Sequence, residues 1–243
     1  MGFFRCLRAE RIKLKRAPVW IAFLVLPAVA AAMGTFNYLQ NLGILTQQWY
    51  SLWSQHTLFS SNFFLPALIA VYCAYLCRLE HFGHNWNAAL TAPAGVSSLY
   101  FAKLAAAACM AALTQLVTGA LFILCGKLAG IQAPLPPELV SWLLLGTLAA
   151  IVIASLQLTL SLVLRSFAAP VGIGLAGGIT GLLLMARGAG LWFPYSLLVA
   201  GMRATDPTAP PVCPPAQFAV ICLGFISLFS AVGILWLKRR DAG

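Results

Sequence analysis

Few side chains in this sequence could do chemistry, because only five of its 243 residues are Asp or Glu. Enzymatic sites commonly need paired carboxylates, or a nucleophile beside a base. The sequence contains neither a pair of this kind nor a Walker A loop or a G-x-S-x-G motif. This pattern disfavours an enzyme.

Metal binding is also disfavoured. His81 and His84 are three residues apart, but no third or fourth ligand lies near them in the sequence. The seven cysteines form no C-x-x-C pair, and most fall within apolar runs, where cysteine behaves as a small hydrophobic residue. We therefore expect two surface histidines, with no metal, disulfide framework or cofactor in this chain.

A glycine motif invites a nucleotide-binding interpretation. Gly172, Gly174 and Gly177 match G-x-G-x-x-G, but a dinucleotide site needs a preceding strand and a helix that starts at the glycines. Here the motif lies inside an apolar run. The spacing instead favours close helix packing at Gly174, Gly177, Gly178 and Gly181, where pairs of small residues are four apart. Unspecific glycine usage in a membrane helix is the alternative.

The composition defines the elements that must position any site. Hydrophobic residues make up 61% of the chain and charged residues only 8%, far below the roughly 25% of soluble domains. The apolar runs show no alternation, so we expect membrane-spanning helices and not barrel strands. The net charge of +10 is concentrated near the two ends of the chain, which indicates membrane orientation and not nucleic-acid binding.

The sequence predicts an all-α membrane protein. An interfacial helix over residues 1–17 precedes a single six-helix domain over 18–243. Twelve of the fifteen Lys and Arg residues fall on one predicted side, which places both termini in the cytoplasm of a bacterial inner membrane. The expected spans are 19–38, 59–77, 100–125, 139–164, 168–185 and 218–237.

Three segments are predicted to lie outside, and one of them is the Pro- and Gly-rich turn Gly126–Pro137. Leu39–Leu58 has no Lys, Arg, Asp or Glu and reads as a loop, with Trp49, Tyr50 and Trp53 at the membrane interface. The segment before the last span is expected to contain a short re-entrant or interfacial helix that is broken at Pro194.

The first residues have the pattern of a basic amphipathic helix on an anionic membrane surface. The alternative is a signal peptide that is cleaved after the small residues Ala30–Ala32. The residues expected to form the interfacial helix include Phe4, Leu7, Arg8, Glu10 and Arg11.

The segment Arg78–Lys103 is the longest polar interruption that does not resemble an external loop. One hypothesis is a docking element, in which Trp86 and Leu90 share a helix face and insert into a partner's groove. The alternative is that Glu80 pairs with Arg78 and Trp86 anchors at the lipid headgroups. Lys103 is expected to extend to the cytoplasmic surface. Since all acids are predicted to lie outside the spans, we expect no proton relay or coupling-ion site.

Several short motifs of this sequence are similar to those of a known family and follow one another in the same order. The chain resembles membrane subunits of type-2 ABC exporters, and specifically the lantibiotic-immunity permeases. The spans are richer in Ala than is usual for that family, which leaves the substrate open. The matching elements are Glu10-Arg-Ile-Lys13, then Glu80, Asn85-Trp86-Asn87, Pro93 and Leu99-Tyr100-x-x-Lys103, and finally Trp192–Ser196 and Trp236–Asp241.

The resemblance implies a six-helix permease that pairs with a second permease or a copy of itself on two cytoplasmic ATPases. ATP and Mg²⁺ would be bound by those partners, and the substrate would be an antimicrobial peptide or another amphiphile exported from the membrane. A scaffold or sensor subunit without transport is the alternative function. The residues expected to contact the ATPase are Glu80, His81, Asn85, Trp86, Leu90 and Pro93.

Overall fold

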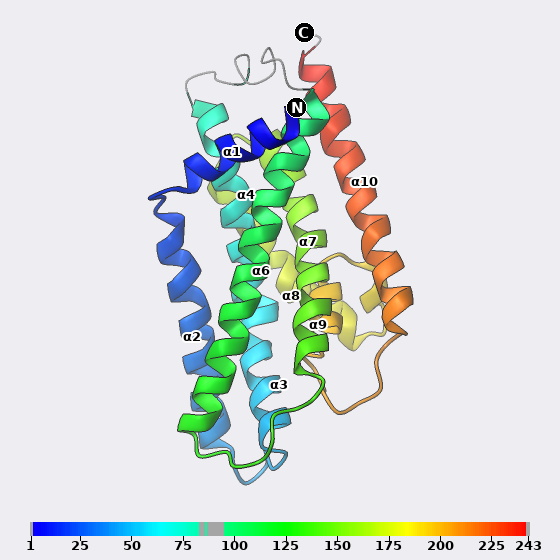
Figure 1. Ribbon diagram of the computed structural model, residues 1–243. Helices are drawn as coiled ribbons and strands as arrows, with labels where there is room; N and C mark the ends of the chain where they lie inside the picture. Colours follow the sequence, from blue (N-terminus) through cyan, green and yellow to red (C-terminus); the bar gives the residue numbers. More distant parts are fainter. Residues whose placement is uncertain (1, 83–85, 87–94, 242–243) are drawn as a thin grey trace.

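The computed structural model describes residues 2–82, 86 and 95–241, and every regular element in these ranges is helical. Six helical segments are long and apolar enough to cross a membrane, which confirms the predicted all-α fold with six spans. They form an elongated bundle in which α1 begins and α10 ends at the same end (Figure 1). The spans are α2 (Val19–Gln40), the continuous run α3 (Trp49–Phe59), η1 (Ser60–Phe64) and α4 (Leu65–His81), then α6 (Val96–Leu128), α7 (Leu139–Val163), α8 (Ala168–Ala186) and α10 (Pro215–Asp241).

The first helix, α1 (Gly2–Leu14), crosses the end of the bundle instead of running along it (Figure 1). A sharp turn separates it from α2, and Arg16 in that turn has φ 62°, a left-handed conformation that is uncommon for residues other than glycine. Leu14 and Glu10 are its buried residues, so α1 packs against the bundle through one side only. This arrangement places its remaining basic side chains at the edge of the molecule.

The second span differs most from its prediction. The expected external loop over Leu39–Leu58 is wrong, because α3 begins at Trp49 and only residues 41–48 separate it from α2. Polar side chains in α3 bond within the helix: the Thr57 hydroxyl donates to the carbonyl of Trp53 at 2.7 Å. The segment therefore remains helical despite its polarity, and its lack of charge does not indicate a loop.

A π-helical turn, η1, joins α3 to α4. Pro66 has no N–H to donate to the carbonyl of Asn62 four residues earlier, so the normal α-helical bond cannot form there. The Leu65 N–H instead bonds to the carbonyl of Ser60, five residues back. The wider turn lets one long helix pass through the bundle without a break.

Two tryptophans predicted to lie at the membrane interface are instead in the protein core. Trp49 is 1% exposed and Trp53 is 0% exposed. Trp53 stacks on Trp142 with ring centroids 5.2 Å apart, and its indole N–H donates to the carbonyl of Met202 at 2.7 Å. The N–H of Trp49 reaches the carbonyl of Ala133 at 2.8 Å. Because both indole donors find protein acceptors, neither ring needs the polar interface.

The expected short helix before the last span is present, but it is buried. A 3-10 turn, η3 (Gly190–Trp192), is followed by Pro194 and then by α9 (Ser196–Gly201), all of whose residues are buried. Close contacts with α8 allow this short helix to be buried. A Cβ atom at Gly177 would lie 2.5 Å from the Tyr195 ring, and one at Gly181 would lie 2.9 Å from the Ser196 nitrogen.

The other face of α8 approaches the π-helical turn. A Cβ atom at Gly178 would lie 2.3 Å from the carbonyl oxygen of Asn62, and one at Gly174 would lie 2.9 Å from the carbonyl oxygen of Pro66. All four glycines named from the sequence are buried and face neighbouring elements. Their missing side chains allow α8 to fit between η1 and α9.

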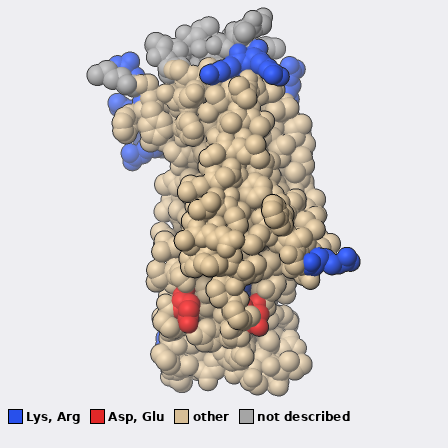
Figure 2. Space-filling view, turned by 90° about the vertical axis from the view of Figure 1, so that its right-hand side faces the viewer, with Lys and Arg blue, Asp and Glu red and all other residues tan. Residues whose placement is uncertain are grey.

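The surface of the bundle is largely apolar between its ends. Figure 2 shows most Lys and Arg side chains in view near the end where α1 crosses, and Asp and Glu side chains towards the opposite end. The outward faces of the spans expose large aliphatic residues, which suit a lipid environment. Examples on α2 and α10 are Ile21, Leu24, Val220 and Leu223.

Candidate functional site

Four charged side chains from three helices meet beneath α1. Lys103 of α6 is 0% exposed, and its Nζ lies 2.7 Å from Glu80 Oε1 of α4 and 3.0 Å from Glu10 Oε1 of α1. The third ammonium donor of Lys103 is used by the carbonyl of Leu76, at 2.7 Å. All three donors of this buried cation therefore have acceptors, as a desolvated charge requires.

Lys13 completes the cluster from the rim. Its Nζ lies 2.8 Å from Glu10 Oε1, one helical turn earlier, and it also pairs with Glu80 Oε1. Two lysines thus face two carboxylates, so the group is neutral overall. Desolvation makes a buried ion pair a weak source of net stability, but removal of one member leaves an uncompensated charge and costs about 3–5 kcal/mol. The main consequence is that α1, α4 and α6 are joined in one fixed register.

The structure places Lys103 and Glu80 differently from their sequence-based interpretations. Lys103 does not extend to the surface, because its ammonium group is enclosed by the cluster. Glu80 does not pair with Arg78; its partners are Lys103 and Lys13. Arg78 is exposed and lies over the ring of Phe82, 5.4 Å from its centroid.

One signal in the sequence could have identified the cluster. Glu10 and Lys13 belong to one of the motifs that resemble the exporter family, and Glu80 and Lys103 belong to another. The structure brings all four together, although Glu10 and Lys103 are 93 residues apart. Lys103 interrupts a long apolar run in α6, and a charge in such a position is usually paired.

Next to this cluster, His81 links α4 to α7 and to Trp86. One ring nitrogen, Nε2, lies 2.7 Å from the carbonyl oxygen of Ser161, and the indole N–H of Trp86 donates to Nδ1 at 3.2 Å. An indole can only donate and a carbonyl can only accept, so these contacts assign the neutral imidazole with its proton on Nε2. His81 therefore joins both neighbours through opposite sides of one ring.

Trp86 is buried in the protein and is not an exposed anchor at the lipid headgroups. It is 2% exposed and packs edge-on against His81, with ring centroids 5.5 Å apart. In this arrangement its ring belongs to the hydrophobic core of the chain. Three other residues expected to contact an ATPase lie outside the described ranges: Asn85, Leu90 and Pro93.

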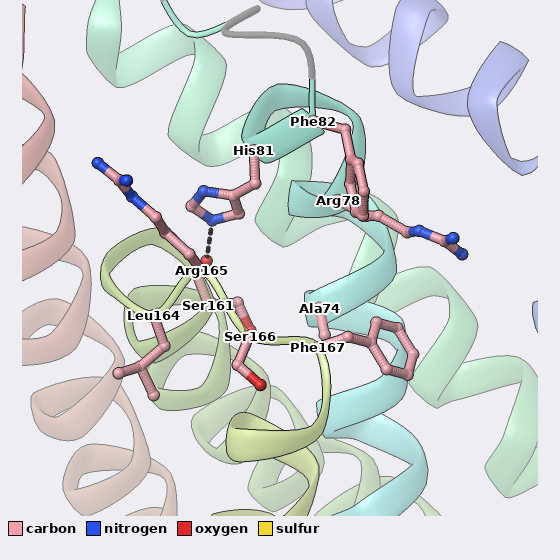
Figure 3. Close-up of a pocket in the computed structure, with 9 residues that line it drawn as sticks. All are labelled: Ala74, Arg78, His81, Phe82, Ser161, Leu164, Arg165, Ser166 and Phe167. Carbon is pink, nitrogen blue, oxygen red and sulfur yellow. Dashed lines mark hydrogen bonds between the residues drawn. The ribbon is translucent and has the colours of Figure 1, made fainter.

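A small pocket opens beside His81, between the end of α4 and the turn from α7 to α8 (Figure 3). Its volume is about 270 Å³. Arg78 and Arg165 lie on opposite sides of His81, and their guanidinium groups point away from the pocket (Figure 3). Both arginines and the flanking Phe82 and Phe167 are exposed, so this surface combines cations with aromatic rings.

The residues named for the interfacial helix divide between two sides of α1. Phe4 is 77% exposed, and Arg8 and Arg11 are also exposed, whereas Glu10 is 1% exposed in the cluster. Leu7 is half-buried. Glu10 is thus a structural contact to the bundle and not part of a membrane-facing surface.

The site holds charges and helices in place but offers little for covalent chemistry. Among the described residues, no group of three His, Cys, Asp or Glu side chains is close enough to hold a metal ion. Both carboxylates in the cluster are engaged by lysines, and their second oxygens have no polar partner. The arrangement is suited to mechanical connection between α1, α4 and α6.

Comparison with known proteins identifies the family. A model of the ABC-2 family of transporter proteins matches residues 6–181, which is more than half of the chain. The matched region runs from α1 into α8 and includes all four residues of the charged cluster. No curated protein matches the chain significantly. The chain belongs to the ABC-2 transporter family, and it is a membrane permease component of an ABC transporter.

Proposed function

We propose that this permease exports an amphiphilic antimicrobial peptide from the membrane and thereby protects the cell that produces it. The family assignment supports the permease role. The export of such a peptide rests on the sequence motifs that are similar to lantibiotic-immunity permeases. In this proposal two cytoplasmic ATPases bind ATP and Mg²⁺, and a second permease, or a copy of this chain, completes the membrane part.

The proposed orientation puts α1 and the end of α10 in the cytoplasm. Positively charged residues are enriched on the cytoplasmic side of membrane proteins. The end of the bundle crossed by α1 carries most of the basic side chains visible in Figure 2. Two exposed acids, Glu138 before α7 and Asp206 in the loop after α9, belong to segments near the other end (Figure 1). A cysteine-specific, membrane-impermeant reagent should therefore label Cys213 in intact cells when the other cysteines are removed.

The ATPases are proposed to act on the segment between α4 and α6. The observation that carries this proposal is the buried cluster, because Glu80 ends one flank of that segment, Lys103 begins the other, and Glu10 adds α1. A displacement of the segment would therefore move three helices together. Arg78, Arg165, Phe82 and Phe167 provide an exposed basic and aromatic surface beside it, which suits an acidic, apolar groove on a partner.

The experiment is reconstitution of the chain with a candidate ABC ATPase. ATP hydrolysis is measured in proteoliposomes with and without a cationic antimicrobial peptide, and peptide release from the vesicles is followed. We expect the peptide to stimulate hydrolysis and to leave the membrane only with ATP. An ATPase that binds without peptide release would support the sensor function, and an ATPase that does not bind would contradict the docking proposal.

A conservative variant tests the connection through His81. Trp86→Phe keeps an aromatic ring but removes the N–H that bonds to His81 Nδ1. One hydrogen bond contributes about 1 kcal/mol, so peptide-stimulated hydrolysis should fall about fivefold while ATPase binding is retained. Trp192→Phe, at a highly exposed position, is the matched control. Unchanged coupling in Trp86→Phe would exclude this connection.

A further inference from the structure

A groove of about 900 Å³ lies between the outer side of α1, the start of α2 and the first half of α6. Small residues of α6 form its wall: Ala105 and Ala106 leave space beneath α1, and Cys109 and Leu113 continue the wall along the span. Trp20 closes the α2 side, where its indole N–H donates to the carbonyl of Leu14 at 2.8 Å. The groove is thus formed by packed helices, and its wall along α6 is apolar.

One end of the groove is strongly basic. Arg8, Arg11, Lys15 and Arg16 line it, and the spacing of three and four residues between the first three puts these on one stripe of α1 and its following turn. All four are exposed, and the lining contains no acid within the described residues. The nearest acid of α1, Glu10, is turned to the opposite side and paired with Lys103. The positive charge at the groove is therefore not neutralised by the protein.

The other end of the groove opens towards lipid. Leu113 and Leu116 of α6 and Ile21 and Leu24 of α2 are exposed apolar residues of membrane spans. A ligand here would have an anionic head beside α1 and an apolar tail beside α6. A cationic peptide has the wrong charge for the basic end, so the groove is distinct from the proposed transport path.

We propose that this groove binds one anionic phospholipid, with its phosphate held by Arg8, Arg11 and Lys15 and an acyl chain along Ala105, Cys109 and Leu113. Clusters of Lys and Arg on an amphipathic helix bind anionic headgroups. Here the cluster is joined to a preformed apolar groove, which converts general surface attraction into a single site. The bound lipid holds the side of α1 that faces the groove, and the Glu10–Lys103 ion pair holds the side that faces the bundle.

The test counts lipids that remain on the purified full-length chain, by native mass spectrometry. The probes are phosphatidylglycerol and phosphatidylcholine with identical acyl chains. We expect one phosphatidylglycerol per chain to be retained in preference to phosphatidylcholine. Each basic residue near an anionic surface raises affinity about fivefold, so the triple variant Arg8→Gln, Arg11→Gln, Lys15→Gln should bind about 100-fold more weakly.

The control removes the same charge elsewhere: Arg5→Gln, Lys238→Gln and Arg239→Gln, none of which lines the groove. Equal losses in the two triple variants would overturn the site, because they would show attraction to net charge alone. A second variant, Cys109→Trp, fills the groove without a change in charge and should also release the lipid.

Lipid retention by Cys109→Trp would overturn the position of the acyl chain. Disulfide crosslinking between the Cys109 residues of two copies, with no effect of added phosphatidylglycerol, would assign the groove to a second copy and would also contradict the proposal.

Discussion

The two ends of the bundle are held together by different kinds of contact. At the end crossed by α1, two lysines and two glutamates share a buried, neutral cluster. At the opposite end, Trp53 stacks on Trp142 and packs edge-on against Phe122, with ring centroids 5.0 Å apart. Charges join the helices at one end, and aromatic packing joins them at the other.

This difference predicts how substitutions at each end affect the stability of the protein. Apolar contacts are non-directional, and each contributes in proportion to the area that it buries. Members of a buried charged cluster depend on one another, since a missing partner leaves a desolvated charge. We therefore expect graded responses to substitution at the aromatic end and a steep response at the charged end, beside the segment on which we propose that the ATPase acts.

The largest effect should come from Lys103→Met. The substitution keeps a long apolar side chain but removes the cation that contacts Glu10 and Glu80. Two carboxylates would then share Lys13 alone, and we expect the free energy of unfolding to fall by about 3–5 kcal/mol. The measurement is an SDS titration of the purified full-length chain in mixed micelles.

The control for this variant is Lys127→Met on the same helix, where the lysine is exposed and its contact with the Trp49 ring, 5.7 Å from the centroid, should contribute no more than about 1 kcal/mol. Addition of Glu10→Gln to Lys103→Met balances the charge again and should recover part of the loss. A single variant as stable as the wild type would show that the cluster does not hold the helices, and the proposed contrast between the two ends would be lost.

At the aromatic end, Gly126→Ala tests how closely α6 and α3 are packed. A Cβ atom at Gly126 would lie 2.1 Å from the ring of Trp49, so the indole must move and its bond to Ala133 must weaken. Overpacking of this kind costs about 1–3 kcal/mol. The same SDS titration measures it. Gly224→Ala, a helical glycine with open space around it, is the control and should be neutral or slightly stabilising.

Trp53→Phe should have a smaller effect. The phenyl ring keeps most of the contacts with Phe122 and Trp142, but the carbonyl of Met202 loses its donor. We expect a loss of about 1–2 kcal/mol, measured by the same titration. A loss as large as that of Lys103→Met would mean that the aromatic end is as intolerant as the charged end.

The spans were predictable from sequence because their signal is local. A run of apolar residues must be helical in lipid whatever its neighbours are, and the predicted number of spans agrees with the six helices that are long and apolar enough to cross a membrane. The exception is α3: Ser51, His56 and Thr57 lower its hydropathy, yet all three are buried in the bundle. Burial against other helices is a tertiary property, and hydropathy does not report it.

The charged cluster was not predictable as a unit because its members are distant in sequence. Lys103 near a helix start looks the same whether it reaches the surface or a buried partner, and Lys13 and Glu80 are 67 residues apart. Trp53 and Trp86 pose the same problem. An indole with one polar atom suits the membrane interface and a core with a free acceptor equally well.

The smallest effect should come from Asp206, an exposed acid in the loop that follows α9. Its Oδ1 accepts bonds from the Thr208 N–H at 2.9 Å, the Thr208 hydroxyl at 2.7 Å and the Ala209 N–H at 3.2 Å, and these bonds lower the pKa of its carboxyl group. A lowered pKa in the folded state stabilises the fold above the ordinary value of about 3.9, and this contribution disappears as the pH falls through the folded-state pKa.

Asp206→Ala should therefore cost no more than about 1 kcal/mol at neutral pH, because the charge is exposed and its bonds are local. Asp206→Asn retains the acceptor oxygen and should lose less. Thermal unfolding in detergent between about pH 6 and 3 measures both variants, and the difference between wild type and Asp206→Ala should narrow as the carboxyl group is protonated. A difference that widens at low pH would show that Asp206 is stabilising in its protonated form. An exposed charge with local partners would then not be the weak contributor that its contrast with the buried cluster requires.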